Sequence, residues 1–198
     1  MTSTLEVASR TPIKLFQDDQ LRIRKTLGVD PKTIQDHLEI LEGAYLVRTL
    51  PLLAVNVRKR LRKAPTIHLR DSGIAHSLLG IETLTRLQTN PITGRTWESF
   101  CIDQIIRMTE TRPENCFTYS EQSGREVDLV LERPNGRIGF EIESSESAIP
   151  NDSHRQLVKD LNLEQLYIVR RGEGNFNTGA GTHSIGITEL PSICQRIR

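Results

Sequence analysis

The chain has 198 residues, a net charge of +1, and a composition that is 36% hydrophobic and only 5% aromatic, so any core is largely aliphatic. No apolar run approaches the roughly 20 residues that cross a bilayer, and no basic segment followed by an apolar stretch marks a secretory signal at the N-terminus. The three cysteines are dispersed, which argues against a disulfide framework or zinc ribbon and fits a reducing compartment. We expect a cytoplasmic protein without a membrane partner.

The small net charge hides an uneven distribution along the chain. Residues 1–70 hold 13 Lys and Arg against 7 Asp and Glu, whereas residues 71–198 hold 13 against 18. A basic first part and an acidic second part indicate two modules with different partners.

The basic part contains a predicted helix-turn-helix between Asp19 and Arg48. A short apolar helix leads to a turn at residues 28–29, after which Asp30 caps a second helix that has Pro31 at its first position. Gly43 is expected to end this helix as its C′ residue. The helical face is formed by Ile34, Leu38 and Leu41.

Residues 44–47 and 52–57 are predicted as the two strands of a wing, so residues 1–64 would form a winged-helix module. If the module binds DNA, Lys32, Thr33 and Gln35 face the major groove. The wing cations would contact phosphates without much sequence preference; they are Arg58, Lys59, Arg60, Arg62 and Lys63. Alternatively the module contacts a protein, because Asp36 and Glu39 on the exposed helix face disfavour base reading.

The acidic part is predicted to form an α/β domain over residues 65–198. A helix is predicted over about residues 96–110. Its apolar face consists of Trp97, Cys101, Ile105 and Met108, and Phe100 widens this face. Residues 90–95 and 172–182 read as loops. The remaining expected elements are strands at 66–71, 116–120 and 165–170 and helices at 72–79 and 154–161.

Two further strands carry three carboxylates. Val127, Leu129 and Leu131 alternate with polar residues in the first strand, as Ile138, Phe140 and Ile142 do in the second. Asn135-Gly136 between them suits a type I′ turn. A loop of two or four residues places Asp128, Glu141 and Glu143 on one face, whereas a loop of three or five scatters them. Clustered carboxylates require a cation, raised pKa values or exposure to water.

Four stretches in this order resemble a known family. They are Leu27-Gly-Val-Asp with Thr33-Ile, Ile67-His-Leu-Arg-Asp-Ser-Gly, Gly94-Arg-Thr-Trp-Glu-Ser-Phe, and Gly124-Arg-Glu-Val-Asp-Leu with Phe140-Glu-Ile-Glu-Ser-Ser. The chain resembles the C-terminal region of prokaryotic AAA-type ATPase-like proteins, over about residues 15–170. In that family a winged helix precedes a domain of unknown function with a restriction-endonuclease-like, PD-(D/E)xK fold.

The resemblance implies a site at Glu98, Asp128 and Glu141, in which Asp128 and Glu141 would hold Mg²⁺ or Mn²⁺. Active members carry lysine at the next alternate position, where this chain has Glu143. Lys159 could reach in from the following helix, although no spacing requires it. The implied role is an accessory DNA- or partner-binding module of an ATPase-like protein that lacks cleavage and requires no cofactor. The alternative is a Mg²⁺-dependent phosphodiesterase that uses Asp128 and Glu141.

Other activities have little support in the sequence. No Gly-x-x-x-x-Gly-Lys-[Ser/Thr] motif is present, so we expect no ATP hydrolysis by this polypeptide. The five histidines form no His-x-x-x-His pair and are expected to be surface or hydrogen-bonding residues. A protein partner or a homo-oligomer is compatible with these observations, as is DNA.

Overall fold

The computed structural model describes residue 28 and residues 30–54, 65–121 and 123–198. The chain divides into two compact units, one of residues 1–50 and 62–100 and the other of residues 51–61 and 101–198. Residue 64, where we expected a domain boundary, lies outside the described residues, and that boundary stays a prediction. Helix α6 (Thr93–Thr109) begins in the first unit and ends in the second. None of the described helices is both long and apolar enough to cross a membrane.

Helix α3 (Pro31–Gly43) of the first unit forms where its capping residues predict. The Asp30 carboxylate accepts the backbone N–H groups of Lys32 and Thr33 at 2.8 and 3.1 Å, which satisfies two amides that lack a partner within the helix. Ile34 and Leu38 are buried against the sheet, as the helical spacing indicates. The helix expected before it lies outside the described residues.

The C-terminus of α3 differs from the expectation. Gly43 remains within the helix, and Tyr45 adopts the left-handed conformation with φ of 59°. The N–H of Leu46 bonds to the carbonyl of Leu41, and the N–H of Tyr45 to that of Glu42, which is a Schellman motif. The Arg70 guanidinium lies 5.5 Å from the centre of the Tyr45 ring.

The strand pairing of the first unit also corrects the sequence prediction. Strand β1 (Val47–Leu50) pairs antiparallel with β2 (Thr66–Leu69), whereas we expected residues 52–57 as its partner; of these, residues 55–57 lie outside the described residues. Leu52 instead forms an isolated parallel bridge to Thr118 in the second unit's sheet. Residues 44–46, expected at the start of a wing strand, form the turn after α3.

Two short helices, α4 (Ser72–Leu78) and α5 (Leu84–Gln88), lie between β2 and α6. α4 was expected, and α5 was not. α6 begins at Thr93, within the stretch we expected to be a loop. Its most buried side chains are Cys101, Ile102, Ile105 and Ile106, so the apolar face is centred differently from our prediction. Phe100, which we placed on that face, is 39% exposed.

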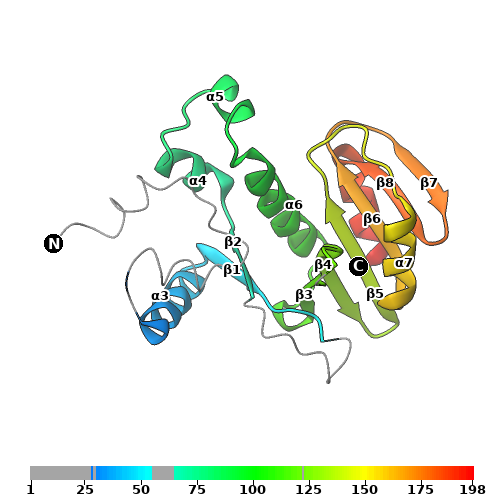
Figure 1. The fold of residues 1–198 in the computed structure, drawn as a ribbon, viewed down its shortest axis with the longest axis horizontal. Coiled ribbons are helices and arrows are strands. Elements are labelled where there is room, and N and C mark those ends of the chain that lie inside the picture. Colours follow the sequence, from blue (N-terminus) through cyan, green and yellow to red (C-terminus); the bar gives the residue numbers. More distant parts are fainter. Residues whose placement is uncertain (1–27, 29, 55–64, 122) are drawn as a thin grey trace. The chain divides into compact units, whose positions relative to one another are not determined.

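The second unit is built on a six-stranded mixed sheet, which confirms the α/β class (Figure 1). The strand order is β3-β4-β5-β6-β8-β7. Strand β4 is antiparallel to both of its neighbours, β3 and β5. Strands β5, β6 and β8 are parallel to one another, and the edge strand β7 is antiparallel to β8. The bounds are β3 (Cys116–Ser120), β4 (Glu126–Arg133), β5 (Gly136–Ile142), β6 (Leu163–Arg170), β7 (Asn175–Gly179) and β8 (Thr182–Gly186).

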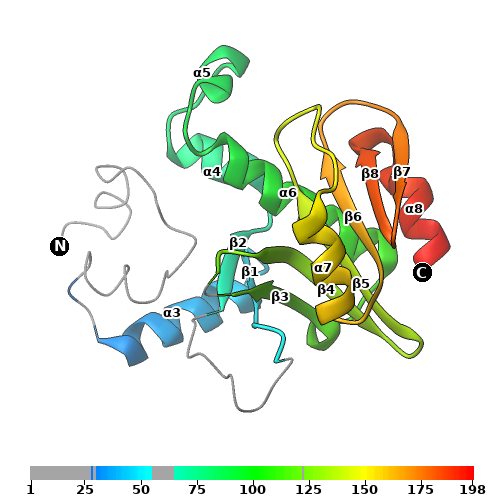
Figure 2. The ribbon, with the colours of Figure 1, turned by 45° about the vertical axis from the view of Figure 1, so that its right-hand side comes forward.

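Helices cover both faces of this sheet. α7 (Asp152–Asp160) crosses from β5 to β6 on one face, and α8 (Leu190–Ile197) lies on the other (Figures 1 and 2). On the α7 face, Leu157 and Leu161 pack against Leu166 and Ile168. Burying such aliphatic side chains contributes about 1.5–3 kcal/mol each. On the opposite face the aromatic ring of Tyr167 stacks between those of Phe140 and His183.

The segment expected to be a flexible loop at residues 172–182 contains strand β7. The buried guanidinium of Arg170 fixes the residues just before β7, because it donates to the carbonyls of Glu173 and Gly174 at 2.7 and 3.2 Å. The same guanidinium donates to the carbonyl of Glu146 at 3.0 Å. One buried arginine therefore joins the loop after β5 to the loop after β6.

Candidate functional site

The β4–β5 hairpin positions the carboxylates predicted to form the site. Arg133 pairs with Gly136, which leaves a two-residue loop, one of the lengths for which we expected the acids on one face. The turn nevertheless lies at Pro134 and Asn135, not at Asn135-Gly136. Asn135 has no positive φ, so the turn is not type I′, and Pro followed two residues later by Gly is typical of type I.

Asp128 lies where the β4–β5 ladder ends. Leu129 and Phe140 form the last pair of the ladder, and Asp128 and Glu141 are the next residues on their strands. One carboxylate oxygen of Asp128 accepts the backbone N–H of Ile142 at 2.7 Å. This bond continues the connection between the strands after the regular ladder stops.

Glu141 lies on the α7 face, because its partner on β6 is Ile168 of the α7 cluster. Its Oε1 is 3.6 Å from Nε2 of His154 on α7, and the two side chains are only 16% and 12% exposed. Its other oxygen, Oε2, is buried and has no hydrogen-bond partner among the residues that the structure describes. A buried acceptor without a partner is costly, and such groups concentrate at functional sites.

His154 is fixed by the N-terminus of α7. Its Nδ1 accepts the backbone N–H of Asn151 at 3.0 Å, while the Asn151 side chain accepts the N–H of His154 at 3.2 Å. An accepting Nδ1 places the proton of the neutral ring on Nε2, the nitrogen that faces Glu141. His154 is therefore a hydrogen-bond donor to the site and not a metal ligand. Sequence reasoning missed it, although a His three residues after Asn indicates a capping position.

The remaining predicted site residues are distributed as follows. Glu143 follows β5, with its N–H bonded to the carbonyl of Val169 at 2.8 Å, and its side chain is half-buried. Lys159 is exposed on α7. Glu98 is half-buried on the part of α6 that belongs to the first unit, and its part in the site stays a prediction.

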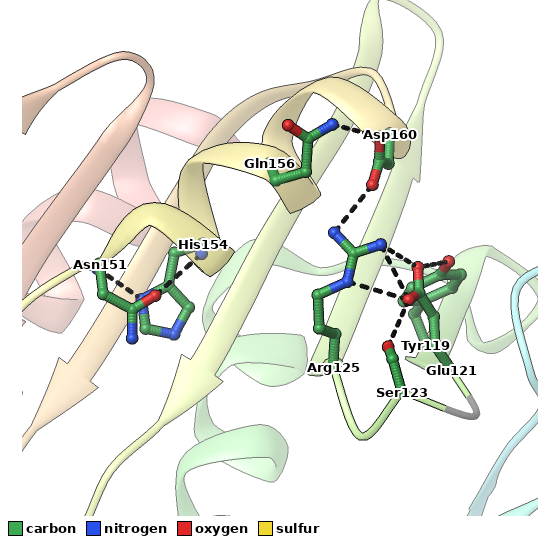
Figure 3. A network of polar contacts seen from close by, with 8 residues as sticks. All are labelled: Tyr119, Glu121, Ser123, Arg125, Asn151, His154, Gln156 and Asp160. Carbon is green, nitrogen blue, oxygen red and sulfur yellow. Dashed lines mark hydrogen bonds and ion pairs between the residues drawn. The ribbon is translucent and has the colours of Figure 1, made fainter.

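A network of polar side chains fastens the β3–β4 loop to α7 (Figure 3). The Arg125 guanidinium bonds to both carboxylate oxygens of Glu121 at 2.9 Å and to Asp160 of α7 at 3.0 Å. Burial disfavours the charged Glu121, but hydrogen bonds from Tyr119, Ser123 and Arg125 outweigh it and hold the pKa of Glu121 below its usual value. Burial, together with Glu121, raises the pKa of Tyr119 to about 12.

The candidate site supplies few ligands for a metal ion. Among the residues that the structure describes, no group of three or more His, Cys, Asp and Glu side chains could hold a metal. Asp128 and Glu141 alone supply the hard oxygen ligands that Mg²⁺ and Mn²⁺ prefer, and such ions retain several waters when few carboxylates bind them. The predicted cation site thus remains a two-carboxylate site.

The residues predicted to bind DNA fall into two groups. Gln35 is exposed on α3 and Thr33 is half-buried, but the Thr33 hydroxyl donates to Asp30 at 2.7 Å and the Gln35 amide to Glu39 at 3.0 Å. Lys32 is exposed. The wing cations from Arg58 to Lys63 lie outside the described residues.

Comparison with known proteins finds two family models along the chain. Residues 7–85 match a family described as "Domain of unknown function (DUF8612)", and residues 93–190 match one described as "Domain of unknown function (DUF4143)". The junction between the two matches thus lies after residue 85. No solved structure matches the chain significantly.

Two mycobacterial proteins are similar to most of the chain. They are the "Uncharacterized protein Rv2008c" of Mycobacterium tuberculosis and the "Uncharacterized protein Mb2031c" of Mycobacterium bovis, each 34% identical over 163 residues. The match covers 82% of this chain but 36% of each relative, so the chain spans about a third of their length. The site described above therefore belongs to a region that matches a domain of unknown function and that recurs in these longer mycobacterial proteins.

Proposed function

We propose that this chain is an accessory, partner-binding module of a longer ATPase-like protein, with a nuclease-like second unit that does not cleave. The observation that carries the proposal is the anion at residue 143. Glu143 occupies the position that the family resemblance assigns to a water-orienting lysine, two residues after Glu141. A carboxylate there cannot supply the positive charge that positions the attacking water.

Two comparisons support the longer context. The resemblance leads us to expect a domain of unknown function after the first module, and residues 93–190 match such a domain. The relatives extend well beyond the matched region, which leaves room for a nucleotide-binding domain. The winged-helix and restriction-endonuclease-like folds are part of this proposal.

The surface of α3 favours a protein partner over DNA. Ile40 and Tyr45 are 67% and 75% exposed at the end of this helix. The helix carries three carboxylates against one lysine, which would repel phosphates. An exposed apolar surface with an acidic rim suits a partner protein with basic residues around an apolar contact.

The proposal is tested by nicking of supercoiled plasmid with Mg²⁺ or Mn²⁺. The wild type and Asp128→Asn, which keeps the shape of the side chain, are expected to show the same background rate. Sedimentation of the same chain with Tyr45→Lys tests the partner surface: an oligomer formed through α3 would dissociate. Cleavage by the wild type that Asp128→Asn abolishes would contradict the absence of catalysis.

One observation favours the alternative, a Mg²⁺-dependent phosphodiesterase. The buried Oε2 of Glu141 has no hydrogen-bond partner among the described residues, which suits an oxygen that can ligate a cation. Asp128 and Glu141 directly follow the last pair of the β4–β5 ladder on their two strands. Calorimetric titration with Mn²⁺ tests whether these carboxylates bind the ion, because a metal site loses its binding heat in Asp128→Asn; the nicking assay then distinguishes the two functions.

A further inference from the structure

A second polar site lies in the first unit, apart from the carboxylates. Arg48 on β1 pairs directly with His68 on β2, and directly opposite residues of antiparallel strands share a face. On that face the Nδ1 of His68 lies 3.1 Å from the hydroxyl of Ser99 on α6. Arg95 precedes Ser99 by four residues and so lies one helical turn away on the same side of α6.

His68 is buried without full hydrogen bonding. Only 4% of the residue is exposed, and within the described part of the chain its Nε2 has no hydrogen-bond partner. A buried ring nitrogen that makes no bond costs about 1–3 kcal/mol, so its position requires an explanation. The Ser99 hydroxyl can donate to Nδ1 or accept from it; in the first arrangement, which anion binding requires, Nε2 carries the proton and is a donor that lacks an acceptor among the described residues.

Two arginine side chains, those of Arg48 and Arg95, act electrostatically on this donor. Burial and the charges of Arg48 and Arg95 lower the pKa of His68 to about 4, so the ring is neutral at pH 7. Arg95 is half-buried, and no carboxylate of the described chain segments is paired with its guanidinium. A guanidinium and a ring N–H together provide directional donors and charge for an oxyanion.

We propose that Arg48, His68, Arg95 and Ser99 form a binding site for a small oxyanion, a phosphate or a carboxylate. His68 Nε2 would donate one hydrogen bond, and the guanidinium of Arg95 would provide the charge. The site does not depend on the carboxylates of the second unit. It assigns a role to His68 and Arg95, which lie in two of the four stretches that resemble the family and which the proposed function leaves unused.

The test is a titration of the ¹⁵N-histidine-labelled chain with inorganic phosphate at pH 7.5 and constant ionic strength, with acetate in a parallel titration. The His68 ring nitrogens, followed by NMR, are expected to shift in a saturable manner with one or both anions. Saturation by phosphate alone identifies a phosphate site, and saturation by acetate alone identifies a carboxylate site. Either result supports the proposal.

Arg95→Gln is the informative variant because the residue is half-buried and its loss is compatible with folding. Removal of one charge-assisted contact is expected to weaken anion binding by about tenfold or more. Arg86→Gln, which removes the same charge from α5, is the matched control and should leave the affinity within about twofold. An absence of saturation with both anions, or equal affinities in wild type and Arg95→Gln, would overturn the proposal.

Discussion

His154 and Glu141 face each other from a helix and a strand, with Nε2 and Oε1 3.6 Å apart. The helix N-terminus determines this arrangement, because the backbone N–H of Asn151 occupies the other ring nitrogen. A side chain that caps α7 thus also supplies a hydrogen-bond donor to the candidate site. The fold thereby contributes to the site a group that lies outside the β4–β5 hairpin.

Asn151→Ala is expected to reduce the free energy of unfolding by about 1 kcal/mol, because the N–H of His154 loses its acceptor. Urea denaturation measures the change. Asn175→Ala, on the exposed edge strand β7, is the control and should remain within about 0.5 kcal/mol of wild type. Equal losses for the two variants would show that the capping bonds contribute nothing.

Arg125 and Asp160 are expected to be energetically coupled, since their side chains are only 28% and 32% exposed and the bond joins the β3–β4 loop to α7. A double-mutant cycle with Arg125→Met and Asp160→Asn should give about 1 kcal/mol of coupling, decreasing with added salt. The exposed pair Arg112–Glu114 is the comparison, with coupling near zero. Similar coupling in both pairs would show that the Arg125–Asp160 bond fastens the β3–β4 loop to α7 no more strongly than an exposed ion pair would.

His68 predicts a specific loss of stability in acid. The pKa of His68 is about 4 in the folded chain against an ordinary 6.5, so the unfolded chain binds more protons between these values. Stability therefore falls as the pH falls from about 6.5 to 4, in total by on the order of 3 kcal/mol. His68→Gln should remove this slope, and His37→Gln on the exposed face of α3 should not. A His68 ring that titrates near 6.5 by NMR would contradict the prediction.

Any DNA affinity should come from the basic run after β1 and not from α3. Simultaneous replacement of Arg58, Lys59, Arg60, Arg62 and Lys63 by Ala should flatten the dependence of log affinity on log salt, because fewer counterions are released. Replacement of Thr33 and Gln35 by Ala should leave the affinity and its salt slope unchanged, since both side chains bond within α3. An unchanged slope in the first variant would remove the run from the interface.

Local signals in the sequence predicted local structure well. Asp30 and Pro31 mark the start of α3, and residues 116–120 form the expected strand. The hairpin that carries Asp128 and Glu141 follows from alternating apolar residues. In each case the deciding forces, capping bonds and burial of alternate side chains, act between residues near in sequence.

The errors share a different cause, because long-range contacts decide those elements. β1 pairs with a strand that begins 16 residues after β1 ends, and no local signal in the sequence indicates this pairing. β7 is polar and exposed, so it lacks the apolar alternation of a buried strand and forms by pairing with β8. His154 could be placed beside Glu141 only once α7 was known to cross over β5.

If Glu143 disables a nuclease-like site, Glu143→Lys should restore cleavage. Plasmid nicking with Mn²⁺ is measured for wild type, Glu143→Lys and the neutral control Glu143→Gln. We expect background rates for wild type and Glu143→Gln and faster nicking by Glu143→Lys that Asp128→Asn removes. Nicking by the wild type that depends on Asp128 and is not increased by Glu143→Lys would contradict this expectation.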